Sequence, residues 1–504
     1  MAKAIGIDFG TTKTVLAAVQ GGKPSVLPNA AGDRSTPSVV AFTDGQHLIG
    51  ASARRQAVLN PRGTIFGVPR LLGQAYQTAH AEMPRTAYLM EPGPQDRLRI
   101  RIRQDVYTPE EIAAVLLRSL VEDSIQSLGE RVEQVVVTVP ASFSAAQRQA
   151  LCTAHRLAGL QVQQILNAST AAVLAYSVEK QDSATIMLVD LGGGSCSVAL
   201  FDVGGGVCEA RVSIGDPSLG GDRFDTCLAE YVAEQFQPGQ QLDLWADHQA
   251  LQRLYEAVER AKCELSSVTH TRLCLPHLVR AATGSRHLDM ALTRAQFETL
   301  TAPLGHRCAA LVQQALAYAQ MSPDDIDEVL LVGGASRTPM ILNGLKELLG
   351  QKTAILSLYA TEMAAVGAAL QAGILNGTCA GPLVFDVTSL RLSVKTVDQT
   401  SIPVIEPNTP LPCRKTLTFS PPEDNPRRLE LTVLQTQPDS SSDSETVYHV
   451  LIQDIRSIPL ATPAPQGVPQ IAVTFDIDTN GLLSVSAIDQ DTGSVLQVTL
   501  NSPS

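Results

Sequence analysis

Two short stretches combine an aspartate with glycines and hydroxyl side chains, and this combination suits phosphate binding. The first reads DFGTTK at 8–13 and the second reads DLGGGS at 190–195, and each lies between two apolar runs. Glycines leave backbone amides open to a ligand that a Cβ would exclude. An aspartate at the strand end would repel a phosphate, but it can hold Mg²⁺ through water. Each stretch therefore predicts a β-hairpin whose tip contacts phosphate and whose carboxylate orders a magnesium ion.

The pairing of the two stretches is the stronger signal, because a single Asp-Leu-Gly-Gly-Gly is more often an ordinary tight hairpin. Two hairpins of one design predict two related lobes that clamp one nucleotide. A third loop, GGAS at 333–336, follows the apolar run 328–332 and precedes a helix that begins at Met340. There, backbone amides and a helix N-terminus can meet a phosphate or a sugar.

Helix and strand signals place these loops on a layered scaffold. Thr108 caps a helix that ends near Leu128, and Ser144 caps a helix that ends at Leu157. The run 134–140 (QVVVTVP) is apolar on both faces, which is typical of a strand inside a covered sheet.

One long helix and one mixed segment allow further predictions. The amphipathic helix 247–265 carries Glu259, Lys262 and Ser266 on one face, because residues three and four apart are neighbours on a helix. From the residues alone, a surface ion pair is the ordinary interpretation and a ligand contact is the alternative. Residues 74–106 are mixed in character and contain prolines, so they predict only a surface segment.

The chain changes character near residue 378. The cluster 378–382 breaks the helical pattern, and from Asp386 onward only strands are predicted. Asn480-Gly481 between alternating runs is a strong hairpin signal, and short strands over about 120 residues favour a β-sandwich. The run 439–445 (DSSSDSE) predicts a solvated loop. We expect a first domain at 1–378, a linker at 379–386 and an all-β domain at 387–504.

The composition is that of a globular protein with several domains. The 504 residues are 44% hydrophobic, and the formal net charge of -12 does not favour a nucleic acid or an anionic membrane as a partner. A strand follows Met1-Ala2-Lys3 directly, which leaves no room for a signal peptide, and no apolar run reaches a membrane-spanning length. The nine cysteines form no CxxC pair, so we expect reduced thiols in a cytoplasmic protein, with Cys152, Cys196 and Cys263 buried.

By these motifs the chain resembles the seventy-kilodalton heat-shock chaperones of the DnaK type. The matching segments include IGIDFGTT at 5–12, VVVTVPASFSAAQRQA at 135–150, DLGGG at 190–194, LGGDRFD at 219–225, ERAKCELSS at 259–267, VLLVGGASRTP at 329–339 and PAPQGVPQIAVTFDIDTNGLLSVSA at 463–487. The resemblance implies an α/β, actin-like (ribonuclease H-like), two-lobed ATPase domain followed by an all-β sandwich peptide-binding domain. It also implies ATP or ADP and Mg²⁺ as cofactors.

Carried over position by position, the resemblance assigns the glycine loops and one helix face to the nucleotide. Asp8 and Asp190 are implied to order the magnesium waters, and with Thr12 and Ser195 they form the implied catalytic set. The implied nucleotide contacts are Gly10, Thr11, Thr12, Lys13, Gly192, Gly193, Gly194, Ser195, Gly220, Gly221, Glu259, Lys262, Ser266, Gly333, Gly334, Ser336 and Arg337. The implied peptide-cleft residues, each of which could equally belong to the sandwich core, are Val394, Val397, Phe419, Leu429 and Leu431.

Three polar groups that the family places around the reacting phosphate are missing. Pro69 replaces a lysine that reaches the γ-phosphate, Ala168 replaces a glutamate that holds a magnesium water, and Ser197 replaces an acidic residue. Loss of one charge aimed at a transition state typically costs about 10² to 10³ in rate. Hydrolysis is therefore expected to be weak or lost. Lys13 replaces a neutral residue and either restores some positive charge or faces solvent.

The coupling and partner surfaces of the family are altered as well. Pro140 and Arg148, the family's switch and relay, are present, but the tyrosine of that segment is Ser142. Gln164 stands where a basic residue meets J-domain partners, so a J-domain partner is not expected, whereas a nucleotide-exchange factor fits the resemblance. The sequence stops just after the sandwich, so we expect no helical lid and therefore fast release of bound peptide.

Two functions fit these observations. The first is an ATP-binding cytoplasmic chaperone that binds extended apolar segments of unfolded or nascent polypeptides under nucleotide control, with weak hydrolysis. The second is a non-hydrolysing, ATP-bound regulator or scaffold that works through another chaperone or the ribosome. A small-molecule kinase or a filament former on the same scaffold is less favoured, because the sandwich matches the chaperone pattern in detail.

Overall fold

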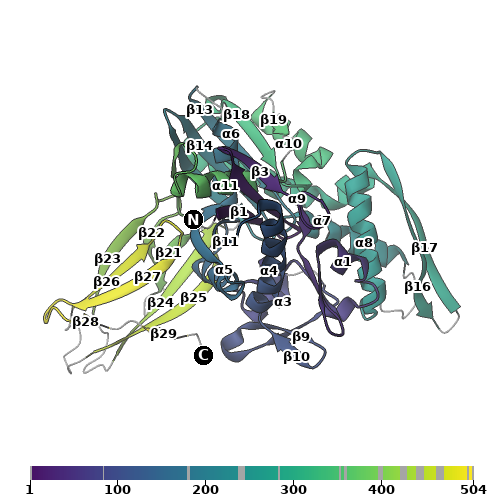
Figure 1. Ribbon diagram of the computed structural model, residues 1–504, viewed down its shortest axis with the longest axis horizontal. Coiled ribbons are helices and arrows are strands. Elements are labelled where there is room, and N and C mark those ends of the chain that lie inside the picture. Colours follow the sequence, from purple (N-terminus) through teal and green to yellow (C-terminus); the bar gives the residue numbers. More distant parts are fainter. Residues whose placement is uncertain are drawn as a thin grey trace.

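The chain forms two α/β lobes and a β-sandwich (Figure 1). The computed structural model describes residues 3–82, 85–178, 182–236, 244–281, 284–350, 354–356, 360–395, 401–420, 428–438, 448–460, 470–496 and 499–501. Figure 1 shows the sandwich, in yellow-green, on one side of the lobes and the hairpin β16 (His270–Ala281) and β17 (Gly284–Thr293) on the other. Val397 and the predicted loop 439–445 lie outside the described residues.

The two lobes repeat one sheet topology. In the first lobe an antiparallel meander is extended by two parallel strands beside its first strand, in the order β12-β11-β1-β2-β3. The second lobe has the same arrangement in the order β19-β18-β13-β14-β15. The prediction of two related lobes is therefore confirmed. The strands are β1 (Lys3–Phe9), β2 (Lys13–Gln20), β3 (Lys23–Leu27), β11 (Val132–Val139), β12 (Gln161–Asn167), β13 (Ala184–Leu191), β14 (Cys196–Gly204), β15 (Val207–Asp216), β18 (Glu328–Val332) and β19 (Ala354–Leu356).

Helices cover both sheets, and their ends follow the predicted caps. The helices that start after Thr108 and Ser144 both begin with a complete capping box, and the Thr108 helix ends at the left-handed Gly129. The principal helices are α4 (Pro109–Leu128), α5 (Ala145–Leu157), α6 (Ala168–Ser177), α7 (Gly221–Phe236), α8 (His248–Leu265), α9 (Arg294–Ala319), α10 (Pro339–Leu349) and α11 (Met363–Leu375). No helix in the described ranges has both the length and the apolar character needed to cross a membrane.

Close packing of α11 joins the two lobes. A Cβ on Gly6 would overlap the backbone of Ala369 in α11, and a Cβ on Gly367 of α11 would overlap the Ala171 oxygen in α6. Glycine is therefore required at both positions, because backbone approaches backbone there. This helix fixes β1, which carries the first hairpin, relative to α6 beside the second lobe.

Residues 74–106 form more than the surface segment that the sequence predicts. They contain α3 (Tyr76–Glu82) and a three-stranded sheet of β8 (Leu89–Pro92), β9 (Leu98–Ile102) and β10 (Asp105–Tyr107). Along β9, Leu98, Ile100 and Ile102 are buried in the core of the first lobe and arginines occupy the positions between them. The prediction is wrong because this alternation is confined to one short strand between prolines and charged residues.

All nine cysteines are free thiols. Cys196 is buried and Cys152 is half-buried, which agrees with their apolar sequence context. Cys263 is exposed, against the prediction, because it lies on the side of α8 that lines a surface pocket with Glu259 and Arg54.

The C-terminal region is all strand, as predicted, and packs two sheets over one core. The sheets have the orders β22-β21-β24-β25-β29 and β23-β26-β27-β28, and the buried core includes Val433, Ile458 and Phe475. The strands are β21 (Arg391–Lys395), β22 (Ser401–Ile405), β23 (Cys413–Phe419), β24 (Arg428–Pro438), β25 (Tyr448–Pro459), β26 (Ile471–Ile477), β27 (Leu483–Asp489), β28 (Val495–Leu496) and β29 (Thr499–Asn501).

The segment before the sandwich joins the second lobe as an additional edge strand. This strand, β20 (Leu383–Phe385), pairs in parallel with β15, with Val207 opposite Leu383. Next to it, the Asp386 carboxylate accepts hydrogen bonds from the Asn167 side chain at 3.0 Å and the Thr170 hydroxyl at 3.0 Å. The linker is therefore held by both lobes.

Direct hydrogen bonds dock the sandwich on the first lobe. The Asn480 Oδ1 atom, in the β26–β27 turn, accepts from the Ile165 amide at 2.9 Å, and its backbone oxygen accepts from Arg148 at 3.1 Å. Arg148 also donates to Asn167 at 2.7 Å, and burial lowers the pKa of its guanidinium to about 10. The Gln435 side chain accepts from the amide of Ala145 at 2.9 Å.

Replacement of Asn480 tests this docking. Asn480→Ala leaves the Ile165 amide without its acceptor, and a lost buried hydrogen bond of this kind costs about 1 to 3 kcal/mol. We expect chymotrypsin to cleave after Phe385 about 5- to 150-fold faster than in the parent protein, because β20 detaches more often. Gln490→Ala, at an exposed position of the same sandwich, is the matched control. Equal cleavage rates for the two variants would show that the Asn480 contacts do not hold the docked arrangement.

Candidate functional site

The tips of the two glycine hairpins touch each other. A Cβ on Gly193 would overlap the Thr12 hydroxyl, and a Cβ on Gly194 would lie 2.7 Å from the Thr11 hydroxyl. No side chain fits at either glycine without moving a threonine. The sequence-predicted residues of both loops are thus brought together, with bare backbone on one side and hydroxyls on the other.

The N-terminus of α7 holds the second hairpin in place. The amides of Gly221 and Asp222 donate to the oxygens of Gly192 and Gly193 at 2.9 and 2.8 Å. A Cβ on Gly220 would overlap the Gly193 oxygen. The positive end of the α7 dipole therefore points at the hairpin tips, where it favours an anion.

Two carboxylates stand at the roots of the hairpins. Burial raises the pKa of Asp8 to about 6, against the effect of the 2.6 Å hydrogen bond that Thr138 donates to it. Burial also raises the pKa of Asp190 to about 7, and the negative charge of Asp8 adds to this rise. Both carboxyl groups are therefore buried, and the charge of Asp8 acts on Asp190.

This pair fits a magnesium ion. A divalent cation beside two buried carboxylates offsets the cost of burying their negative charges, and Mg²⁺ retains most of its water shell in such sites. Asp8 and Asp190 would hold the ion, which would neutralise phosphate oxygens at the hairpin tips. The third predicted loop lies against the same place, since a Cβ on Gly333 would be 2.6 Å from Asp190 Oδ1.

The predicted face of α8 faces the other lobe and α7. Lys262 donates to Asp225 at 2.7 Å and to the Gly221 oxygen at 3.0 Å, while Glu259 pairs with Arg54 of α1 (Gly50–Arg55). Ser266 donates to the backbone of its own helix at 3.4 Å. The ion-pair interpretation is therefore confirmed for Glu259 and Lys262, and the ligand contact stays a prediction.

The third predicted loop contains a residue that stabilises the loop and residues that are exposed to solvent. Ser336 is buried and its hydroxyl donates to the Gly333 oxygen at 2.7 Å, so it braces the loop. Gly334 and Arg337 are exposed, and Lys13 is exposed on β2.

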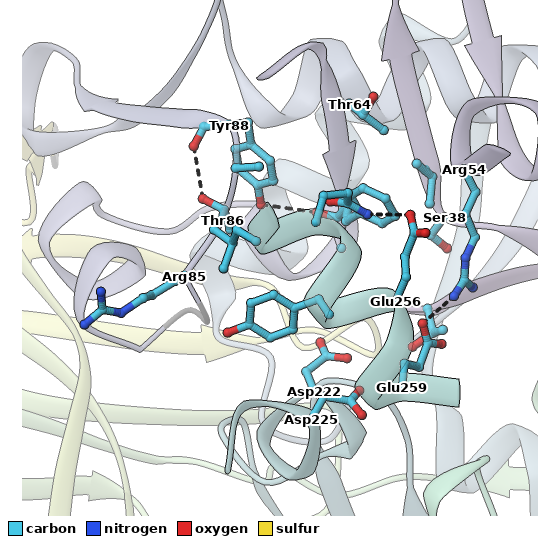
Figure 2. A pocket seen from close by; sticks show the side chains of 18 of the residues that line it. Ser38, Arg54, Thr64, Arg85, Thr86, Tyr88, Asp222, Asp225, Glu256 and Glu259 are labelled. Atoms are coloured by element: carbon cyan, nitrogen blue, oxygen red, sulfur yellow. Dashed lines mark hydrogen bonds and ion pairs between the residues drawn. The ribbon is translucent and has the colours of Figure 1, made fainter. Parts of the chain in front are cut away.

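A cleft leads away from the hairpin tips between the lobes. Thr11 and Thr12 line its inner end, and Arg54 and Arg85 stand at opposite ends of it in Figure 2. Arg70 lies 3.9 Å from Asp222 across the lobes. The other lining side chains include Phe66, Tyr88, Asp225, Leu251, Gln252, Tyr255, Glu256 and Glu259.

Sequence reasoning named Thr11, Thr12 and Glu259 but missed the other cleft residues. A usable signal existed on α8, because Gln252, Glu256 and Glu259 continue one helix face at spacings of four and three. No local signal existed for Arg85, whose aromatic partner Trp245 comes from a distant segment.

The positions where the resemblance implies that catalytic groups are missing come from three different elements. Pro69 is buried in α2 (Val68–Leu71), and Ala168 is the first residue of α6. Ser197 is buried opposite Asp190 in the β13–β14 ladder. The hydroxyl oxygens of Ser142 and Ser169 are buried without a partner in the described part of the chain. No basic side chain from these positions faces the carboxylates.

The predicted peptide-cleft residues pack into the sandwich core. Val394, Leu429 and Leu431 are between 1% and 5% exposed, and Phe419 is partly buried against them. Val397 lies outside the described residues. In this arrangement Val394, Leu429 and Leu431 are not available to a ligand, whereas Phe419 is partly exposed.

Comparison with known proteins identifies the family. The family model described as Hsp70 protein matches residues 4–504. The chain belongs to the Hsp70 family. A chaperone protein DnaK of Thermus thermophilus is 45% identical over 502 residues, covering 99% of this chain and 80% of the relative. A chaperone protein dnaK of Cyanidioschyzon merolae is 44% identical over 507 residues, covering 100% and 82%, and a chaperone protein dnaK3 of Thermosynechococcus vestitus is 43% identical over 496 residues, covering 98% and 72%.

Hsp70 membership confirms the family and the fold class predicted from sequence. The repeated sheets are the two lobes of an actin-like ATPase domain, and the sandwich is the substrate-binding domain of this family. The functional class, an ATP-dependent molecular chaperone of the Hsp70 type, follows from the same relatives.

The buried carboxylates predict how stability depends on pH. The folded-state pKa values of Asp8 and Asp190 lie above the value of 3.8, so their contribution to folding is complete below about pH 4 and is lost as the pH rises through 6 and 7. Asp190→Asn cannot ionise. Without Mg²⁺ we expect it to exceed the parent protein in stability by about 1 to 2 kcal/mol at pH 8, with no difference near pH 4.

Thermal unfolding between pH 4 and 8 measures this difference. Asp491→Asn, which removes an exposed carboxylate, serves as the control. A parent protein that is as stable as Asp190→Asn at pH 8 without Mg²⁺ would contradict the assignment.

Proposed function

We propose that this chain is an Hsp70-type chaperone that retains ATP with Mg²⁺ and hydrolyses it slowly. One observation carries the proposal: the two hairpin tips, the α7 N-terminus and the carboxylates of Asp8 and Asp190 converge, while Pro69 and Ala168 occupy the places of the family's lysine and glutamate. The groups that would bind a triphosphate are therefore present, and groups that would promote its hydrolysis are absent.

Different groups of residues would bind different parts of the nucleotide. The backbone of Gly192–Ser195 and the hydroxyls of Thr11 and Thr12 would bind phosphate oxygens, and Asp8 and Asp190 would order the magnesium waters. Glu259, Lys262 and Ser266 would hold the adenosine with Gly334 and Arg337 opposite. Division of the chain at 1–378, 379–386 and 387–504 would let nucleotide act on the sandwich through β20 and Asp386.

We further propose that the clients are extended apolar segments of unfolded or nascent polypeptides. Val394, Phe419, Leu429 and Leu431 would contact a client only after the sandwich rearranges, because they are packed in its core here. The nine free thiols support a reducing compartment, and we place the protein in the cytoplasm. A nucleotide-exchange factor fits this proposal better than a J-domain partner, given Gln164.

The alternative is a non-hydrolysing, ATP-bound regulator of another chaperone or the ribosome. The buried cleft candidates favour it, since three of them are at most 5% exposed. It differs from the first proposal in needing no client binding.

Calorimetry and a hydrolysis assay on one preparation test the nucleotide proposal. We expect binding heat and thermal stabilisation with Mg²⁺ and ATP, and radiolabelled ATP should stay bound and intact for many minutes. Absence of heat and of stabilisation would refute nucleotide binding. Turnover as fast as that of ordinary relatives would refute the assignment of Pro69 and Ala168.

Restoring the missing groups gives a sharper prediction. Pro69→Lys combined with Ala168→Glu should raise the single-turnover rate of hydrolysis at least about tenfold, because it returns a cation and a water ligand to the transferring phosphate. Pro92→Lys with Ala295→Glu places the same charges at exposed positions outside the site and should change nothing. If the hydrolysis rate of the first variant is unchanged, the site is not arranged to hydrolyse ATP. That result would favour the non-hydrolysing regulator.

A further inference from the structure

The first and second lobes meet across the mouth of the cleft through a cation–aromatic contact. The Arg85 guanidinium carbon lies 4.8 Å from the centroid of the Trp245 ring. Arg85 belongs to the segment before β8 in the first lobe, and Trp245 precedes α8 in the second lobe. A cation at this distance is attracted by the electron-rich face of an indole ring.

This contact lies apart from the residues assigned to the nucleotide. Figure 2 shows Arg85 at one end of the cleft and the Arg54–Glu259 pair at the other. Thr11 and Thr12 also line this cleft. Parting of the lobes widens this cleft and must separate Arg85 from Trp245, which are fixed to different lobes.

The physical chemistry of the pair suits a reversible closure. Arg85 is exposed and Trp245 is half-buried, so the contact forms and breaks at the surface without disturbing either core. A surface contact of this kind changes a rate or an equilibrium by about two- to fivefold. The Arg85–Trp245 contact joins a charge to an uncharged ring. Salt therefore screens this contact less than it screens a pair of opposite charges such as Arg54 and Glu259.

We propose that the Arg85–Trp245 contact is a clasp that prolongs nucleotide retention, with Arg85 as a positioning residue that acts through lobe closure. This inference rests on the proposed function, because it concerns nucleotide held at the hairpin tips. The clasp slows release by stabilising the closed cleft, and it leaves the contacts of the phosphates and of Mg²⁺ unchanged.

Release kinetics test the clasp. The full chain is loaded with Mg²⁺ and radiolabelled ATP, chased with unlabelled ATP, and sampled by filter binding. Arg85→Ala and Trp245→Ala should each release the nucleotide about two- to fivefold faster. The double variant should release it no faster than either single variant, because both changes break the same contact. Arg85→Lys keeps a cation and should restore most of the retention.

The only tryptophan of the chain gives an independent readout. Excitation of Trp245 in the nucleotide-free protein should show emission at longer wavelength in Arg85→Ala than in the parent, since the ring loses its cover. Arg97→Ala, an exposed arginine of the same lobe, should alter neither emission nor release. Identical emission in Arg85→Ala and the parent would overturn the clasp by showing that the contact does not form in solution.

The outcomes separate this inference from the proposed function. A parent protein that binds no ATP overturns both. A parent that retains ATP, with unchanged release in Arg85→Ala or with additive effects in the double variant, overturns the clasp alone.

Discussion

Contact between the two glycine hairpins is the constraint on which the site depends. Gly193 and Gly194 meet Thr12 and Thr11 so closely that a single Cβ would force the tips apart. The α7 N-terminus binds one of these tips through two amide hydrogen bonds. Because β1 and β13 end at the same tips, their contact also brings Asp8 and Asp190 together. This steric requirement therefore fixes the positions of the two glycine hairpins, of the α7 N-terminus and of the two carboxylates.

The charges of the site are arranged for holding a ligand. Lys262 is engaged by Asp225, and burial raises the pKa values of Asp8 and Asp190. A protein with uncompensated carboxylates gains stability from a bound cation in proportion to its binding free energy. Binding of a cation at this site therefore raises the stability of the folded protein, whether or not ATP is hydrolysed.

Signals from neighbouring residues in the sequence predicted much of the fold. The features that the sequence did not predict depend on contacts between distant segments. Hairpins and caps, such as those at Thr108 and Ser144, depend on neighbouring residues, so a single sequence reveals them. The buried alternation of β9 was missed because its core-facing side chains are defined only by the helices they meet. Likewise, no periodicity links Arg85 to Trp245 or Asn480 to Ile165, since these pairs form only after distant segments fold together.

The linker strand gives the architecture a mechanical consequence. β20 is the edge strand of the same hydrogen-bonded sheet whose middle strand, β13, carries Asp190. A twisted sheet deforms as a unit, because its strands share their hydrogen bonds. A change in the twist of this sheet therefore involves Leu383–Phe385 as well as the root of the second hairpin, which stand on strands separated by β14 and β15.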